Sequence, residues 1–210
     1  DRGLVSEYRF GTRTAAFHVC SRCGAVPFVT CDIDGRLHAS HARGRTRFPA
    51  YLDDHAFLLD ALLALLQLRW NRRDFDWAIA LADTLLERFE DRDGGGFFFT
   101  AHDAEALPQR PKPFIDESLP AGNGIAARAL LKLGRLLGET RYLDAAERTL
   151  RAAWPSLIEL PHACCATLLA LVDFLHPLPH LVVRHRGDAD AWRAAMRHAH
   201  RVSCCGTSRW

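Results

Sequence analysis

The sequence has no apolar run long enough to cross a lipid bilayer. A spanning helix needs roughly 18 consecutive apolar residues, and polar or charged residues interrupt every apolar stretch sooner than that. The start of the chain also lacks the charged and apolar segments of a signal peptide. We therefore expect no membrane association and a cytoplasmic location.

The sequence also lacks an excess of charge of either sign. It has 27 Lys and Arg residues against 25 Asp and Glu residues, which leaves a formal net charge of +2. The basic residues are scattered among the acidic ones, as on a solvated surface. Nucleic acids and anionic membrane surfaces are bound by concentrated positive charge, so we exclude both as partners.

A disulfide framework is not indicated. The seven cysteines are an odd number in a chain of medium length without a signal peptide, which favours a reducing compartment. The 210 residues are 49% hydrophobic, enough for a core of one domain or slightly more. The chain begins at Asp1 instead of Met, so we expect a fragment, a fusion or a processed product.

Short strands are predicted at the amino end. Three runs rich in β-forming residues lie at 8–10, 16–19 and 26–30, and glycines separate them. Cys20 and Cys23 form a CxxC motif followed by Gly24, a turn that directs two thiolates toward one metal ion. A structural zinc site needs four ligands. Cys31 is either a third ligand or a small buried residue.

The segment YRFGTRTAAFHVCSRCGAVPFV, residues 8–29, resembles the carboxyl-terminal part of the glutathione-dependent formaldehyde-activating enzymes, the CENP-V/GFA domain. The resemblance implies that Cys20 and Cys23 are zinc ligands and that the activity is that of a zinc-dependent carbon–sulfur lyase. The family's earlier CxC motif and its catalytic cysteine cluster have no counterpart in this chain. We assign residues 1–37 to a truncated segment of this kind, similar to a zinc ribbon.

Helical periodicity dominates from residue 51 onward. Apolar residues recur every three or four positions over 51–66 and 75–88, and again over 124–137, 140–154 and 161–175. We expect Asp74, Asn123 and Thr140 to cap three of these helices, Gly138 to end one, and Trp154 to lie on a buried face. In the tail, a short strand over 181–184 and a helix from Asp188 or Asp190 to His200 are predicted.

An internal repeat supports paired helices. The run ALLALL at 61–66 matches ALLKLG at 129–134, and FDWAIA from Phe75 matches YLDAAE from Tyr142. A helical hairpin cannot bury its apolar face alone, so repeated hairpins stack into a solenoid or close into an α/α toroid. We therefore predict a mainly α chain, with a partial α/α toroid over 38–187 and a carboxyl-terminal helix and tail over 188–210.

Three motifs in order carry a second resemblance: GRTRFPAYLDDHAFLLDALLALLQL, FEDRDGGGFFFTA and RPKPFIDESLPAGNGIAARALLKLG. They are similar to the group that contains spermatogenesis-associated protein 20 and bacterial thioredoxin-domain proteins of the DUF255 type. The resemblance implies an α/α toroid similar to N-acylglucosamine 2-epimerases and six-hairpin glycosidases. It leaves out the thioredoxin-like domain and the first hairpins, so we expect an incomplete ring with weak or no activity.

Toroids of this kind bind sugars at inner-helix ends and long loops. Epimerisation needs an acid/base pair, and glycoside hydrolysis needs two carboxyl groups. Because loops as long as residues 90–121 are commonly functional, catalytic candidates are Asp54 and His55 at the first helix and Asp116 and Glu117 in the loop. The acids of the first turn either face a pocket or favour the helix dipole. The loop acids either bind sugar or pair with Arg110 and Lys112.

Three further residues are candidates for sugar binding: Arg110, Asn123 and Phe98. Asn123 is either a ligand or a helix cap. The three phenylalanines at 97–99 either stack on a sugar ring or form a hairpin with one buried face. His162, Cys164 and Cys165 open an apolar helix, and core packing is the favoured interpretation there.

Three hypotheses follow from the sequence. The first is a carbohydrate-active-type domain, epimerase-like or glycosidase-like, with a sugar-like ligand. The second is the zinc-dependent lyase. The third is a non-catalytic helical-repeat binding module that self-associates through open toroid edges, because an open ring exposes apolar surface.

Overall fold

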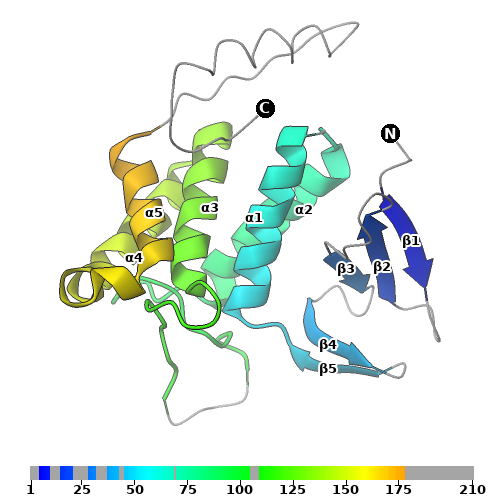
Figure 1. Cartoon of the computed structure of the whole chain (residues 1–210), viewed down its shortest axis with the longest axis horizontal. Coiled ribbons are helices and arrows are strands. Elements are labelled where there is room, and N and C mark those ends of the chain that lie inside the picture. Colours follow the sequence, from blue (N-terminus) through cyan, green and yellow to red (C-terminus); the bar gives the residue numbers. More distant parts are fainter. Residues whose placement is uncertain are drawn as a thin grey trace, which may run out of the picture.

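The computed structural model describes residues 5–9, 15–20, 28–31, 37–42, 45–68, 70–104 and 109–177 (Figure 1). The predicted elements of the tail lie outside the described residues. Five strands precede five α-helices in the chain.

The amino-terminal strands form two antiparallel sheets. The first has the order β1–β2–β3, and the second is the β4–β5 hairpin. Three of the strands were expected from the sequence, whereas the hairpin was not. The strands are β1 (Val5–Arg9), β2 (Ala15–Cys20), β3 (Phe28–Cys31), β4 (His38–Ala42) and β5 (Arg45–Pro49).

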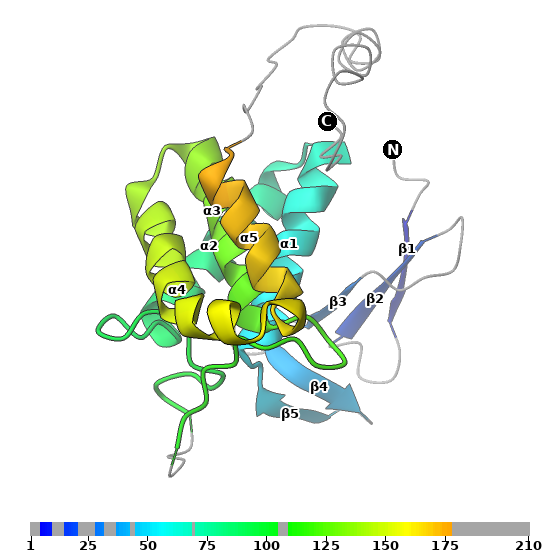
Figure 2. The ribbon, with the colours of Figure 1, turned by 60° about the vertical axis from the view of Figure 1, so that its left-hand side comes forward.

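The helices form two layers of antiparallel hairpins (Figures 1 and 2). In one layer α3 packs between α1 and α5, and in the other α2 packs on α1 while α4 packs on α3. The mainly α prediction is confirmed, and the two layers correspond to the inner and outer helices of an α/α toroid. The helices are α1 (Leu52–Leu68), α2 (Arg72–Arg88), α3 (Gly122–Leu137), α4 (Thr140–Glu159) and α5 (Cys165–Leu175).

The three inner helices run in the same direction. Asp53 contacts Gly122 at the starts of α1 and α3, and further along the two helices the Lys132 ammonium lies 2.7 Å from the Asp60 carboxylate. Between α3 and α5, the Arg128 guanidinium donates to Asp173 over 2.7 Å. All three amino-terminal ends therefore lie at one end of the inner layer.

The core is centred on α3, where ten of its sixteen residues are buried. Small residues let the neighbouring helices approach closely. A Cβ atom on Gly124 would lie 2.6 Å from the backbone nitrogen of Thr167 in α5. Glycine is therefore required at this crossing, because any side chain would push α3 and α5 apart.

Two helix caps differ from the sequence predictions. Asn71, and not Asp74, caps α2, and its Oδ1 accepts hydrogen bonds from the backbone nitrogens of Arg73 and Asp74 at 2.8 and 3.3 Å. Thr140 is the first residue of α4 and not its cap, since Glu139 holds the cap position. The cap of a helix is the residue with extended backbone just before the first turn. The sequence alone does not show which of several nearby polar residues has that backbone.

Other predictions for α3 to α5 have mixed outcomes. Gly138 ends α3 in the left-handed conformation with φ 73°, as expected. Pro161 opens a 3₁₀ helix over Pro161–Ala163, and α5 begins only at Cys165. The expected burial of Trp154 is wrong, because this residue is 52% exposed on the free side of α4.

Candidate functional site

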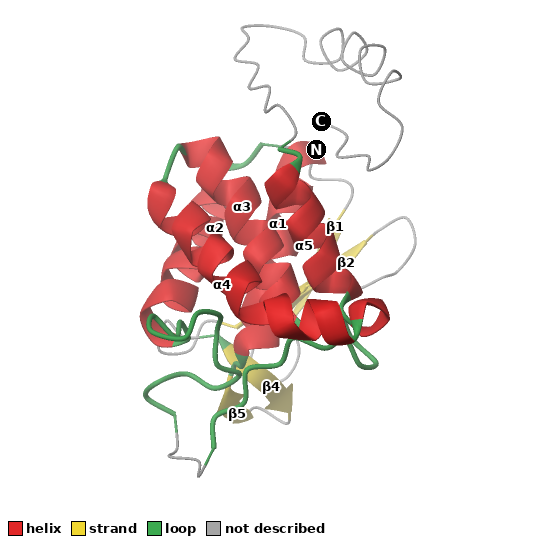
Figure 3. Ribbon diagram, turned by 90° about the vertical axis from the view of Figure 1, so that its left-hand side faces the viewer, coloured by secondary structure: helices red, strands yellow, loops and turns green. Residues whose placement is uncertain are grey.

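The long loop between α2 and α3 lies at the end where the inner helices begin (Figure 3). Its start is a tight turn: Asp91 N donates to Gly96 O, and Gly95 N donates to Asp91 O, each over 2.8 Å. Gly95 and Gly96 have φ of 71° and 78°, which glycine adopts at little cost. The bridge between Glu90 and Phe97 confirms the hairpin interpretation of this turn.

The three phenylalanines after the turn separate into different environments. Phe97 is completely buried in the core, and Phe99 stacks on Tyr51 with ring centroids 4.9 Å apart. Phe98 is half-buried beneath the guanidinium of Arg110, 4.0 Å from the ring centroid. The aromatic surface at this end of the inner layer is therefore the Tyr51–Phe99 pair.

Asn123 holds the loop against α3. It is completely buried; its Oδ1 accepts from Phe97 N over 2.7 Å, and its Nδ2 donates to Phe97 O and Pro113 O at 3.0 and 2.9 Å. The predicted cap role is wrong, because α3 begins at Gly122 and Ala121 holds the cap position. All of these contacts are internal, and the predicted sugar-binding role of Asn123 stays a prediction.

Asp54 and His55 both bond to the backbone of Tyr51 at the start of α1. The Asp54 carboxylate accepts from Tyr51 N over 2.8 Å, the return bond of a capping box. The His55 ring is buried against Phe89, and its Nδ1 lies 2.8 Å from Tyr51 O. Burial lowers the pKa of His55 below its usual value, which favours the neutral ring. Their catalytic roles stay predictions.

Asp116 connects two helix starts. Its Oδ1 accepts from Ala121 N over 2.8 Å, and its Oδ2 accepts from Ala166 N over 2.9 Å. Cys164 at the cap of α5 provides no side-chain hydrogen bond, so Asp116 supplies the capping oxygen from 50 residues away. Glu117 is exposed beside it. Whether either residue is catalytic stays a prediction.

Arg110 folds back onto its own loop. Its guanidinium donates to Thr100 O, lies 3.0 Å from His102 Nδ1 and covers the Phe98 ring. Among the described residues, Arg110 forms no ion pair with Asp116 or Glu117, the alternative considered from the sequence. Lys112 does pair with an acid, since its ammonium lies 2.6 Å from Asp91 Oδ2.

Asp53 is the residue that the sequence did not single out. It is half-buried; its Oδ1 is buried and has no hydrogen-bond partner in the described part of the chain. Burial raises the pKa of Asp53 above its usual value, and the neighbouring Asp54 charge raises it further. A Cβ atom at Gly122 would overlap this oxygen, so glycine leaves the space that the carboxyl group fills.

Asp53 and Asp116 both lie at the start of α3. Asp53 lies against Gly122, and Asp116 accepts from the backbone of the preceding residue, Ala121. Two carboxyl groups from distant segments therefore flank the start of α3. In the sequence, the one local indication of this arrangement is the glycine at 122. Nothing in the pattern links that glycine to an acid almost 70 positions earlier.

The predicted zinc ligands cannot be placed. Cys23 lies outside the described residues, and of Cys20 only the backbone in β2 is described. Within the ranges that the structure describes, no group of three or more His, Cys, Asp and Glu residues could hold a metal ion. Cys164 is buried and Cys165 is exposed, with its thiol 3.4 Å from His162 O. Zinc binding stays a prediction.

Comparison with known proteins agrees with the second resemblance. Human spermatogenesis-associated protein 20 is 29% identical over 153 residues, which cover 72% of this chain and 20% of the relative. The chain is similar in sequence to spermatogenesis-associated protein 20. The rat protein of that name is 28% identical over 153 residues, covering 72% of the chain and 19% of the relative. This chain therefore spans about a fifth of the length of these curated relatives.

Two further comparisons are more distant. An uncharacterized protein of Caenorhabditis elegans is 26% identical over 177 residues, 80% of this chain and 24% of that protein. The solved structure of an unsaturated glucuronyl hydrolase from Bacillus sp. GL1 has a TM-score of 0.39 and 22% identity, covering 65% of this chain and 33% of that one. A likeness at this TM-score supports no conclusion about the fold. We infer the two-layer architecture from the contacts between helices of this chain alone.

The remaining comparisons do not test the resemblance of the amino end. No family model matches the chain. None of the relatives reported above has the name of a formaldehyde-activating enzyme, and that resemblance stays a prediction. Among the helices described here, none is both long and apolar enough to span a bilayer.

Proposed function

We propose that the helical part is a carbohydrate-active-type domain, epimerase-like or glycosidase-like, and that it binds a sugar where α1, α3 and α5 begin. The observation that carries the proposal is Asp53, whose buried oxygen has no partner among the described residues and whose pKa is raised. A carboxyl group with a raised pKa keeps its proton to a higher pH than an ordinary one, which suits it to act as a general acid.

The surroundings of Asp53 are suited to a sugar. Tyr51, directly before α1, stacks on Phe99 of the long loop, and the two partly exposed rings form an aromatic surface at the same end. Asp116 supplies a second carboxyl group at the start of α3. Epimerisation requires groups that move a proton, and glycoside hydrolysis requires two carboxyl groups. Asp53 is the proposed acid, with Asp116 as the second carboxyl group.

Binding is the property to test first, because we expect weak or no turnover. N-acetylglucosamine and glucuronate are titrated into the isotope-labelled chain, and NMR signals of the first turns of α1 and α3 are followed. We expect a dissociation constant of about 1 mM or weaker, and about a tenfold loss in Asp53→Asn. Asp76→Asn is the matched control, because Asp76 is exposed on α2 and pairs only with Arg72.

Two results would reject the proposal. One is the absence of any shift with either sugar. The other is equal binding by the wild-type chain and Asp53→Asn. Circular dichroism of both variants shows that the helices are retained, so a loss of binding in Asp53→Asn alone points to the carboxyl group.

A second candidate function is a helical-repeat binding module that associates with another chain. It is favoured by exposed apolar side chains on the free sides of α4 and α5: Trp154, Ile158, Leu169, Val172 and Leu175, each between 51% and 65% exposed. This hypothesis predicts a stable oligomer and no effect of sugar. Sedimentation equilibrium distinguishes it, since a monomer at all concentrations contradicts it.

The lyase hypothesis makes its own prediction for the amino end. It requires bound zinc, about one ion per chain, as in a four-ligand structural site. Elemental mass spectrometry of the chelator-washed chain should detect that zinc, and Cys20→Ser should lose it. Cys165→Ser is the control because this thiol is exposed on α5. If no zinc is detected, the lyase hypothesis is rejected and any function of the chain belongs to its helical part.

A further inference from the structure

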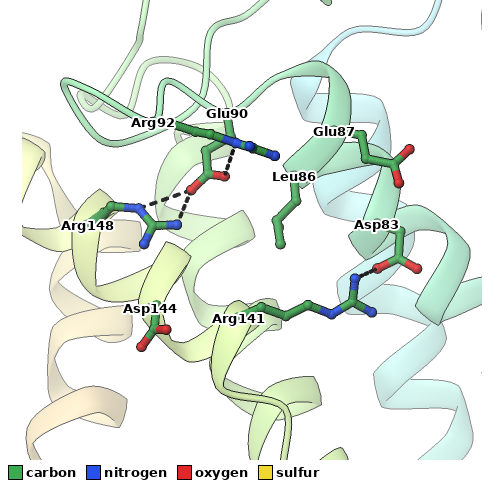
Figure 4. Close-up of a pocket in the computed structure, with 8 residues that line it drawn as sticks. All are labelled: Asp83, Leu86, Glu87, Glu90, Arg92, Arg141, Asp144 and Arg148. Carbon is green, nitrogen blue, oxygen red and sulfur yellow. Dashed lines mark hydrogen bonds and ion pairs between the residues drawn. The ribbon is translucent and has the colours of Figure 1, made fainter.

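A groove of about 500 Å³ lies on the outer layer between α2, the turn that follows it, and α4 (Figure 4). This volume is within the range of small-molecule sites. The groove is separate from the proposed sugar site, which lies on the inner helices. Its lining combines one apolar residue, Leu86, with seven charged ones: Asp83, Glu87, Glu90, Arg92, Arg141, Asp144 and Arg148.

Two ion-pair groups fix most of these charges. At one side Arg141 lies 2.9 Å from Asp83, and that carboxylate also accepts from the Tyr142 hydroxyl over 2.6 Å. At the other side the buried carboxylate of Glu90 lies 2.5 Å from Arg148, which ties the loop to α4. Because these groups are already paired, they form the walls of the groove instead of binding a ligand.

Three charges remain available. Arg92 is a second cation on Glu90, but it lies 3.7 Å away with its side chain 75% exposed. None of the ion pairs formed within the described part of the chain includes Glu87 or Asp144. Arg92 comes from the turn after α2, Asp144 from α4 and Leu86 from α2, so the three lie on different sides of the groove (Figure 4). The Glu87 carboxylate points away from Leu86 (Figure 4). The groove thus offers an available cation on one side, an available carboxylate on a second and an apolar side chain on a third.

From this arrangement we infer that the groove binds a small zwitterion of the α-amino-acid type. The ligand's carboxylate lies toward Arg92, its ammonium toward Asp144, and its side chain over Leu86. A guanidinium binds carboxylate through two parallel hydrogen bonds. A ligand with only one of the two charges leaves either Arg92 or Asp144 without a partner.

The test uses three matched ligands on the full chain. L-leucine carries both charges, L-leucine methyl ester only the positive one, and N-acetyl-L-leucine only the negative one. Each is added to the isotope-labelled protein up to about 10 mM, near the weak end of specific binding. We expect L-leucine to shift amide signals of α2 and α4, and each single-charge ligand to bind at least about fivefold more weakly.

Variants then identify the two groups. Arg92→Gln and Asp144→Asn are each expected to weaken L-leucine binding about fivefold, as removal of one exposed ion pair does. Glu147→Gln is the control on α4, because Glu147 pairs with Arg151 outside the groove. No shift with L-leucine, equal binding of the methyl ester, or unchanged binding in Asp144→Asn would each overturn the inference.

Discussion

The hairpins α1–α2 and α3–α4 are two copies of one repeat, yet their inner helices begin differently. The predicted repeat places His55 of α1 and Asn123 of α3 at equivalent positions, and both residues are buried polar groups. His55 bonds within its own first turn, to Tyr51, whereas Asn123 bonds to the distant loop at Phe97 and Pro113. The His55 contact thus stays within the start of α1, whereas the Asn123 contacts join the start of α3 to the loop. The loop reaches α1 through its backbone instead, where Leu52 N donates to Phe99 O over 3.0 Å.

The largest loss of stability is expected when the contact between Asn123 and the loop is removed. Asn123→Ala leaves both backbone groups of Phe97 without their side-chain partner in a buried place, at a cost of about 3 kcal/mol in the free energy of unfolding. Urea denaturation measures this value. Asn71→Ala removes an exposed cap and should cost only about 1 kcal/mol. Equal losses would show that Asn123 does not hold the loop.

A second test concerns the close contact of α3 with α5. Gly124→Ala forces a methyl group against the Thr167 backbone, so we expect destabilisation of about 2 kcal/mol. Gly134→Ala is the helical comparison, because the atoms nearest its Cβ would belong to the movable side chain of Leu143, with the backbone oxygen of Glu139 further away at 3.1 Å. The better helix propensity of alanine acts in both variants. A stabilised Gly124→Ala protein would contradict the close packing.

The smallest effect concerns His55 and depends on pH. Its folded pKa is lowered, so the unfolded chain binds the proton more readily. The contribution of His55 to stability is therefore present above its unfolded pKa of about 6.5 and is lost as the pH falls below it, by at most about 1.4 kcal/mol per pH unit.

Urea midpoints between pH 5 and 8 measure this contribution for the wild-type chain and for His55→Gln. The variant should lose less stability at low pH than the wild-type chain, whereas His162→Gln, which alters an exposed ring, should follow the wild-type curve. Parallel curves for the wild-type chain and His55→Gln would show that the buried ring does not titrate as described.

The sequence predicts the architecture better than the site. Apolar periodicity and the repeat indicate the helices because burial of an apolar stripe is a property of the local sequence. Asp53 and Asp54 are adjacent acids that point in different directions, and one caps the helix while the other lies against Gly122. Which of the two acids lies against Gly122 depends on where α3 packs on α1. The local sequence around 53 and 54 does not contain that information.

The link from Asp116 to α5 has a consequence for the order of folding. A helix of eleven residues is marginal by itself, and here its capping oxygen comes from a residue 50 positions earlier. Closing so large a loop costs entropy before the contact forms. Helical structure in α5 should therefore be completed late, after the long loop has docked on α3.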